Sequence, residues 1–471
     1  MEILHVSAEC YPVAKAGGLG DVAGALPKYM NQLGHIAKLV MPMYRTKYLY
    51  DHEWDVVHKG MANLDDWWFE FSVIKEKTNA LGFDLYLVDI YGLLDREKVY
   101  GYDDDAERFT AFQVAVLDWV LSWKHRPNVI HVHDHHTALI PFMLKSCFKY
   151  EALRSIPTVL TIHNAQYQGW MDWDKSRFLP PYDTWRWGLL DWKDRINPLA
   201  SGIKCANKVT TVSNSYLDEL KYMSNGLEDL FEFEKGKCSG ILNGIDTDVW
   251  DPSSDTYLHH RYNADSSKEG KEKNKQDLCN TFNLDPSKPL FAFIGRLVGE
   301  KGADLLPQAI GDAYYYIGRR MNFLILGSGF PEVESALYGM KAQAQRDYDV
   351  YLGYNEGLSH KMYAGADFLL MPSRVEPCGL NQMYAMRFGT VPLVRRVGGL
   401  KDTVRDYGES EGYGICFNHS AVGDITHAIW RAVELYGEQP LLHDLRKRMM
   451  SLDFSWETSV GRYIDLYSQI I

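Results

Sequence analysis

Short apolar runs, each followed by a turn residue and a stretch of helical periodicity, constrain this chain more than any other feature. In Thr158–Ile162 every residue is β-branched or aliphatic, with no alternation of apolar and polar positions. This pattern is typical of strands buried on both faces of a parallel sheet, and strands that alternate with helices imply right-handed βαβ units. The runs form two sets, residues 3–8, 37–42, 85–89, 129–134, 158–163 and 208–213, then 290–296, 323–327, 350–353, 368–373 and 391–395.

A polar segment separates the two sets. Residues 251–275 contain Pro, Ser and Asp and then the charged run 267–273, a composition typical of linkers. We therefore predict an α/β protein with two Rossmann-like domains, residues 1–245 and 250–455, that face each other across a cleft. Residues 456–471 carry apolar side chains at helical spacing, and this helix is expected to pack back on the N-terminal domain.

Composition excludes several classes of protein. The 471 residues fit two or three domains, and 50 Lys plus Arg against 62 Asp plus Glu give a net charge of −12, which argues against nucleic-acid binding. The longest apolar region, residues 111–123, falls short of the ~20 residues of a membrane span. Seven scattered cysteines form no C-x-x-C pair, which argues against a disulfide framework. Without a visible signal or transit peptide, we expect a cytoplasmic protein with no membrane partner.

A glycine-rich segment follows the first predicted strand. Gly17 and Gly18 permit close approach of a ligand at a helix start, and Lys15 before them favours an anion. A dinucleotide fingerprint does not fit, because the glycines lie well beyond the strand end and no acid follows the second strand. Glu9, at the end of the same strand, either faces the cleft or is a solvated carboxylate.

Imidazoles crowd the ends of two further strands. Residues 130–136 contain four histidines and Asp134, for which a zinc site and a substrate-facing strand end are the two interpretations. His163 ends the next strand and is the strongest candidate for an active-site residue in this half. The D-x-D patterns at 103–105 and 246–248 are interpreted as a helix cap and a turn, so we predict no metal.

The second domain offers cations and a carboxylate at strand ends. Arg296 and Lys301 flank a strand-to-helix turn, where they would neutralise a diphosphate leaving group without a metal. Glu376 precedes a proline, which favours a fixed turn from which a carboxylate can bind sugar hydroxyls. Gly379 is expected to begin a helix whose amides meet a phosphate, and Cys378 to be a passive hydrophobic residue.

Together these motifs resemble the bacterial and plastid glycogen/starch synthases, which are retaining glucosyltransferases of GT-B fold. The resemblance rests on residues 15–19, 163–164, 243–250, 295–301, 373–380 and 395–404. It implies glycogen biosynthesis, by transfer of glucose to the 4-hydroxyl at the non-reducing end of an α-1,4-glucan. ADP-glucose is the expected donor and UDP-glucose the alternative, and no cofactor is implied besides this substrate.

The resemblance also implies roles for individual residues. These are catalysis by His163, Arg296, Lys301 and Glu376, donor binding by Lys15, Gly17, Gly18, Asn243, Gly379 and Leu380, and acceptor binding by Asp134 and Glu9. The chain departs from the family pattern at residues 135–136 and in the tryptophan-rich region 170–192, which packs either on sugars or in a core. Two alternatives remain. One is a protein that binds glucan or nucleotide without turnover, and the other is an enzyme of the same fold that makes sucrose or another product from a small acceptor.

Overall fold

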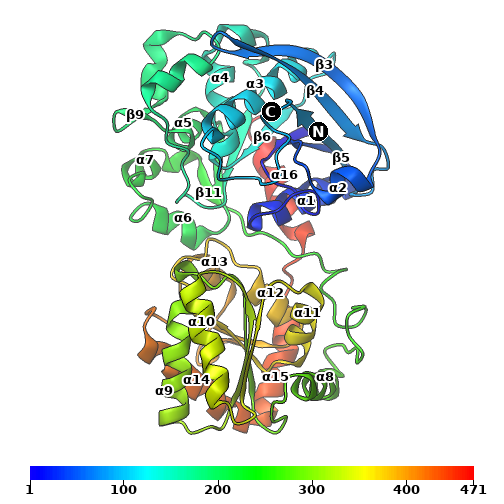
Figure 1. Ribbon diagram of the computed structural model, residues 1–471, viewed down its shortest axis with the longest axis vertical. Coiled ribbons are helices and arrows are strands. Elements are labelled where there is room, and N and C mark those ends of the chain that lie inside the picture. Colours follow the sequence, from blue (N-terminus) through cyan, green and yellow to red (C-terminus); the bar gives the residue numbers. More distant parts are fainter. The chain divides into compact units, whose positions relative to one another are not determined.

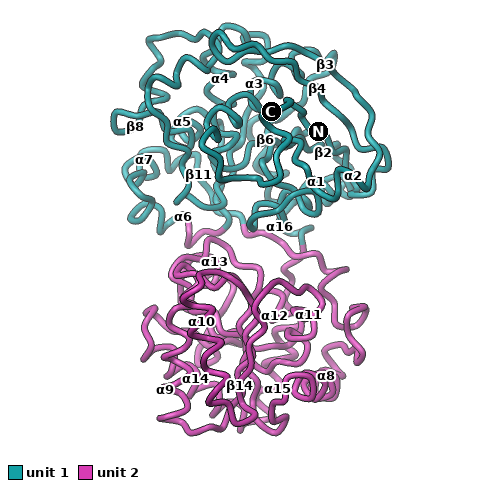
Figure 2. Tube along the Cα trace, in the orientation of Figure 1, with its two compact units in different colours: residues 1–212, 217–241, 456–471 teal, residues 213–216, 242–455 magenta.

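The computed structural model describes residues 1–471, which form two compact units (Figure 2). Unit 1 comprises Met1–Val212, Leu217–Ile241 and Trp456–Ile471, and unit 2 comprises Ser213–Tyr216 and Leu242–Ser455. The end of the chain therefore returns to the unit in which the chain begins.

A nine-stranded sheet forms the centre of unit 1, in the order β11-β10-β7-β6-β1-β2-β5-β4-β3. Its strands are β1 Glu2–Val6, β2 Ile36–Pro42, β3 Trp54–Leu64, β4 Trp67–Glu76, β5 Asp84–Asp89, β6 Val129–His133, β7 Thr158–Ile162, β10 Lys208–Thr211 and β11 Cys238–Gly240. Neighbouring strands from β11 to β5 run parallel, and every residue of β6 and β7 is buried. Because their carboxyl ends share one edge, the residues that follow β1, β6 and β7 come close together.

The antiparallel hairpin of β3 and β4 extends this sheet and was missing from the sequence prediction. In β4 the buried side chains of Phe69, Phe71 and Val73 alternate with more exposed positions. That period of two, with the two-residue turn Asp65–Asp66 before it, is the signal of a hairpin. Strands with one solvated face contain no continuous apolar run, so that pattern does not predict them.

Helices cover the sheet of unit 1 (Figure 1). They are α1 Gly18–Gln32, α2 Lys47–Asp51, α3 Asp105–Leu121, α4 Ile140–Ser146, α5 Pro198–Cys205, α7 Glu228–Phe233, α16 Trp456–Ser468 and, from Leu217 onward, α6 Asn214–Leu220. The last of these, α16, packs against α1: Trp456 stacks on Tyr29 with ring centroids 6.4 Å apart, and Val460 and Tyr463 are fully buried in the same core. Burying this apolar stripe is what holds the end of the chain on unit 1.

Unit 2 contains a six-stranded sheet in the order β14-β13-β12-β15-β16-β17, with every pair parallel. Its strands are β12 Leu290–Ile294, β13 Asn322–Gly327, β14 Tyr348–Leu352, β15 Phe368–Met371, β16 Val391–Arg395 and β17 Ile415–Phe417. Its helices are α8 Ser267–Thr281, α9 Leu306–Tyr316, α10 Pro331–Gly339, α11 Glu356–Gly365, α12 Asn381–Arg387, α13 Gly398–Thr403, α14 Val422–Gly437 and α15 Gln439–Met450.

A small antiparallel pair, β8 Asp191–Trp192 and β9 Arg195–Ile196, lies in unit 1. None of the helices combines the length and hydropathy that crossing a membrane requires.

The charged run at residues 267–273, predicted as part of a linker, lies inside α8, and that prediction is wrong. Lys271 is buried, and its Nζ atom lies 2.7–3.1 Å from four acceptors that share its hydrogens, three backbone carbonyl oxygens and the Thr390 hydroxyl. Lys275 is also buried and pairs with Asp367 at 2.7 Å. A helix whose lysines bind buried acceptors can have the same composition as a solvated linker, so the sequence pattern could not distinguish the two.

Candidate active site

The carboxylate of Glu9 lies inside unit 1, directly after β1. It is 3% exposed, and its Oε2 accepts hydrogen bonds from the backbone N–H groups of Ala16 (2.6 Å) and Gly17 (2.9 Å). Its Oε1 accepts a hydrogen bond from the Tyr100 hydroxyl at 2.6 Å. The alternative of a solvated carboxylate is therefore wrong, because three donors replace water around Glu9. These contacts fix the backbone of the glycine-rich segment.

The glycine-rich segment leaves open space at the start of α1. A Cβ atom added to Gly17 or Gly18 would meet no atom within 4 Å, so packing inside the protein does not require glycine at either position. Lys15 lies 2.7 Å from Asp21 and keeps 39% of its side chain exposed. The Gly17 N–H is already donated to Glu9, so it is the open space at the start of α1 and the accessible ammonium group beside it that suit an anionic ligand.

Asp134 joins the ends of β6 and β7. Its backbone has φ 56° and ψ −177°, a region that residues other than glycine rarely adopt and that is found mostly at functional sites. Its Oδ1 accepts a hydrogen bond from the backbone N–H of His163 at 2.7 Å. Burial is the main cause that raises the pKa of Asp134 to about 7, and the nearby charge of Glu9 adds to it, whereas backbone hydrogen bonds act in the opposite direction.

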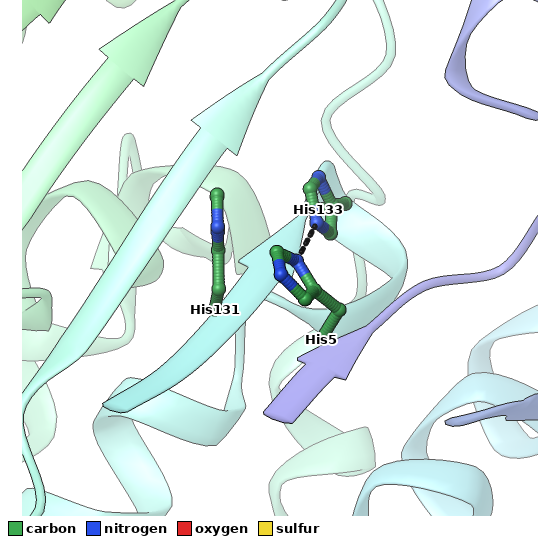
Figure 3. Close-up of side chains that lie close together, drawn as sticks. All are labelled: His5, His131 and His133. Carbon is green, nitrogen blue, oxygen red and sulfur yellow. Dashed lines mark hydrogen bonds between the residues drawn. The ribbon is translucent and has the colours of Figure 1, made fainter. Parts of the chain in front are cut away.

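The histidines of residues 130–136 separate into two groups. His131 and His133 lie with His5 of β1 in a fully buried cluster (Figure 3), in which one ring nitrogen of each residue lies within 4.8 Å of the others. His136 instead stacks on Tyr100, with centroids 4.5 Å apart. His5 was not predicted as a member of this group, because only the parallel register of β1 and β6 places it opposite His131.

His163 is partly exposed at the end of β7 and contacts this cluster. Its Nε2 lies 3.1 Å from Nδ1 of His133, and burial lowers the pKa of His163 to about 3. The imidazole is therefore neutral at physiological pH. A neutral ring at this position can exchange a hydrogen bond with a sugar hydroxyl but supplies no positive charge.

In unit 2 the structure brings Lys301 and Glu376 together. The Nζ atom of Lys301 lies 2.7 Å from each carboxylate oxygen of Glu376, and the Ser373 hydroxyl donates to the same carboxylate at 2.9 Å. Glu376 is nearly buried, whereas Arg296 keeps 57% of its side chain exposed and lies 3.1 Å from Glu300. A cation, a carboxylate and an accessible guanidinium thus follow the ends of the neighbouring strands β12 and β15.

The remaining donor-site candidates surround the turn after Glu376. The helix α12 begins at Asn381, not at Gly379 as predicted, because Gly379 has φ 74° and ends the turn instead. Leu380 occupies the N-cap position, and the side-chain Oδ1 of Asn243 is buried without a partner. Burial raises the pKa of Cys378 to about 12, so its thiol stays protonated, as expected of a passive residue.

Two further interpretations of sequence patterns are changed by the structure. Asp104 occupies the N-cap of α3 but makes no capping bond, and its carboxylate pairs with Arg96 at 2.6 Å, so the interpretation of residues 103–105 as a helix cap is wrong. The tryptophan-rich region is not a closed core, because Trp185 is 92% exposed. Trp173 and Trp187 contact each other edge to face, with centroids 6.1 Å apart.

Comparison with known proteins decides the family. The model of the starch synthase catalytic domain matches residues 2–233, and that of glycosyl transferases group 1 matches residues 274–449. A glycogen synthase from Flavobacterium johnsoniae is 52% identical over 471 residues, which cover all of this chain and 99% of that protein. The chain belongs to the glycogen synthase family. A glycogen synthase from Bacillus cereus, 37% identical over 489 residues and matched over the full length of both chains, is a more distant member.

Solved structures agree with membership of the glycogen synthase family. The catalytic domain of starch synthase IV from Arabidopsis thaliana, bound to ADP and acarbose, superposes with a TM-score of 0.89 at 31% identity, covering 100% of this chain and 99% of that one. Sucrose-phosphate synthase from Thermosynechococcus elongatus, at 15% identity and a TM-score of 0.63, shares the fold alone. The predicted GT-B fold class, with parallel sheets in two domains, and the predicted glycosyltransferase class are confirmed.

Proposed function

We propose that this member of the glycogen synthase family transfers glucose from ADP-glucose to the 4-hydroxyl at the non-reducing end of an α-1,4-glucan, with retention of configuration. The observation that carries the proposal is the pairing of Lys301 with Glu376 beside the accessible Arg296. It offers a place for a sugar diphosphate, with two cations for the phosphates and a carboxylate for sugar hydroxyls. ADP in the related starch synthase IV structure favours the adenine nucleotide over UDP-glucose.

The proposed reaction is substitution on one face of the sugar. The bond from the anomeric carbon to the diphosphate oxygen breaks, and Arg296 and Lys301 stabilise the negative charge that develops on that oxygen. The departing oxygen then takes the proton of the incoming 4-hydroxyl, whose oxygen bonds to the anomeric carbon on the same face. With two cations at the leaving group, we propose that no divalent metal and no cofactor take part.

In this proposal the residues of unit 1 bind the sugar, the donor phosphates and the acceptor. His163 and its backbone carbonyl face the oxocarbenium-like glucose, and Asp134 accepts a hydrogen bond from an acceptor hydroxyl. Lys15, Gly17 and Gly18 bind the donor phosphates. Glu9 has both oxygens occupied by protein donors, which supports a role in holding this segment over the acceptor binding that the resemblance implies.

Initial rates with labelled ADP-glucose and UDP-glucose, each with glycogen as acceptor, test this proposal. We expect label in precipitated glucan, and a higher rate with ADP-glucose. A higher rate with UDP-glucose would overturn the donor assignment. Nucleotide release without label in the glucan, or transfer only to a small sugar phosphate, would overturn the function itself.

A further inference from the structure

A line of side chains leads from α1 across the neighbouring strands β1 and β6 to His163. Nε2 of His5 lies 3.4 Å from Sδ of Met30, and Nδ1 of His5 lies 3.2 Å from Nε2 of His133. Nδ1 of His133 then lies 3.1 Å from Nε2 of His163. Met30, His5 and His133 are fully buried, and Figure 3 shows the bond between the two histidines. The proposed reaction uses only the last member of this line.

All three imidazoles in the line are neutral. Burial lowers the pKa of His5 and of His163 to about 3, and holds that of His133 well below its usual range. A neutral imidazole carries one N–H donor and one bare nitrogen acceptor. Two neighbouring rings can therefore share a hydrogen bond only when one offers its N–H and the other its bare nitrogen.

The thioether at the buried end of the line determines its direction. Met30 has no hydrogen to donate, so its sulfur can only accept from Nε2–H of His5. Nδ1 of His5 is then bare and accepts from Nε2–H of His133, and Nδ1 of His133 in turn accepts from Nε2–H of His163. This sequence leaves Nδ1 of His163 bare. No hydrogen bond within the protein occupies that nitrogen, and the side chain is partly exposed.

We propose that Met30, His5 and His133 are positioning residues that hold His163 in the Nε2–H tautomer, with Nδ1 presented to substrate as a hydrogen-bond acceptor. The inference rests on the proposed function, because His163 contacts the sugar only in that reaction. The three residues do not touch substrate themselves. They act through the orientation and the tautomer of one ring.

A metal ion bound by His5, His131 and His133 is the competing explanation for the cluster. Both ring nitrogens of His131 already have partners, the hydroxyls of Tyr467 and Thr161, each at 2.6 Å. The facing nitrogens of His5 and His133 are bonded to each other. A metal would have to displace hydrogen bonds at all three rings, so the geometry favours the relay.

Nitrogen NMR of the full-length protein labelled with ¹⁵N-histidine tests the relay without any activity measurement. The chemical shifts of the two ring nitrogens report which one carries hydrogen, and loss of a resonance in a single variant assigns it. We expect the Nε2–H tautomer for His5, His133 and His163, and no stoichiometric metal by elemental analysis. A hydrogen on Nδ1 of His163, a charged His163 ring, or bound metal in molar amount would overturn the proposal.

Two variants at one position separate positioning from simple packing. In His5→Asn the amide oxygen can accept from His133 in place of Nδ1, whereas His5→Leu keeps the bulk and removes the acceptor. We expect His5→Leu to lower kcat about 10- to 100-fold with little change in the donor KM, and His5→Asn to restore most of it. Equal impairment of two folded variants would refute the relay. If the wild-type protein lacks transferase activity but shows the expected tautomers, the proposed function fails while the relay stands.

Discussion

Ionisation of the Asp134 carboxyl group, at the end of β6, lowers the stability of the folded protein. Burial raises its pKa from 3.8 to about 7. Between these values the folded protein retains a proton that the unfolded chain has lost, so this group's contribution to stability declines as pH rises. It is present in full below about pH 3.8 and is lost once pH exceeds about 7. We predict that Asp134→Asn removes this decline.

The magnitude follows from the shift in pKa. A difference of about three units corresponds to roughly 4 kcal/mol at most, since each unit contributes about 1.4 kcal/mol. Part of the change is complete below pH 5, and solvent reaches the partly exposed side chain, so we expect about 1–2 kcal/mol between pH 5 and pH 8. Asparagine retains an oxygen to accept from the His163 N–H, and it makes the same steric demand on this backbone conformation as aspartate does.

Denaturant unfolding of both proteins at pH 5 and pH 8 measures this difference. The free energy of unfolding of Asp134→Asn should exceed that of the wild type at pH 8, and the gap should shrink at pH 5. The kcat at pH 8 should fall by about 10- to 100-fold, because the charged acceptor for a substrate hydroxyl is gone. A stability gap that is constant between the two pH values, or a less stable variant at pH 8, would refute the reasoning.

Three further predictions concern unit 2 and the leaving group. Arg296→Ala should lower kcat about 10²–10³-fold with a smaller rise in donor KM, because the cation acts on developing charge. In the same assay the matched control Arg320→Ala, at an exposed arginine, should keep wild-type rates. Lys271→Met should destabilise unit 2 by about 1–3 kcal/mol in urea unfolding, because three buried carbonyls each lose one donor and keep only the hydroxyl of Tyr262 or Thr390. Initial rates should not change in EDTA, and a loss that magnesium or manganese reverses would contradict the proposal that Arg296 and Lys301 suffice.

The central parallel strands were predictable because each is buried on both faces. The strand predicted at residues 158–163, for example, is observed as Thr158–Ile162, one residue shorter at its end. The hairpin strand Trp67–Glu76 was not found, since its pattern has a period of two and half of its residues face outward. Helix α8 was not found either, because the carbonyls that Lys271 contacts and the Asp367 carboxylate that pairs with Lys275 are distant in sequence.

The candidate site could be predicted in part, as a set of residues at strand ends. Pairings between distant segments could not: Lys301 and Glu376 are separated by 75 residues, and nothing in either motif names its partner. The burial of Glu9 depends on Tyr100, which is 91 residues away. His5 belongs to no motif, and only the register of β1 against β6 places it beside the other histidines.

The most direct test of the account is to follow the position and the configuration of a newly added glucose. The full-length protein is incubated with ADP-glucose labelled in the sugar and with glycogen, and the recovered glucan is digested with β-amylase, which releases maltose from non-reducing ends only where the linkage is α-1,4. We predict that the label is released early and as maltose. Label that resists this digestion, or that appears only as free glucose, would contradict a retaining transfer to the non-reducing end.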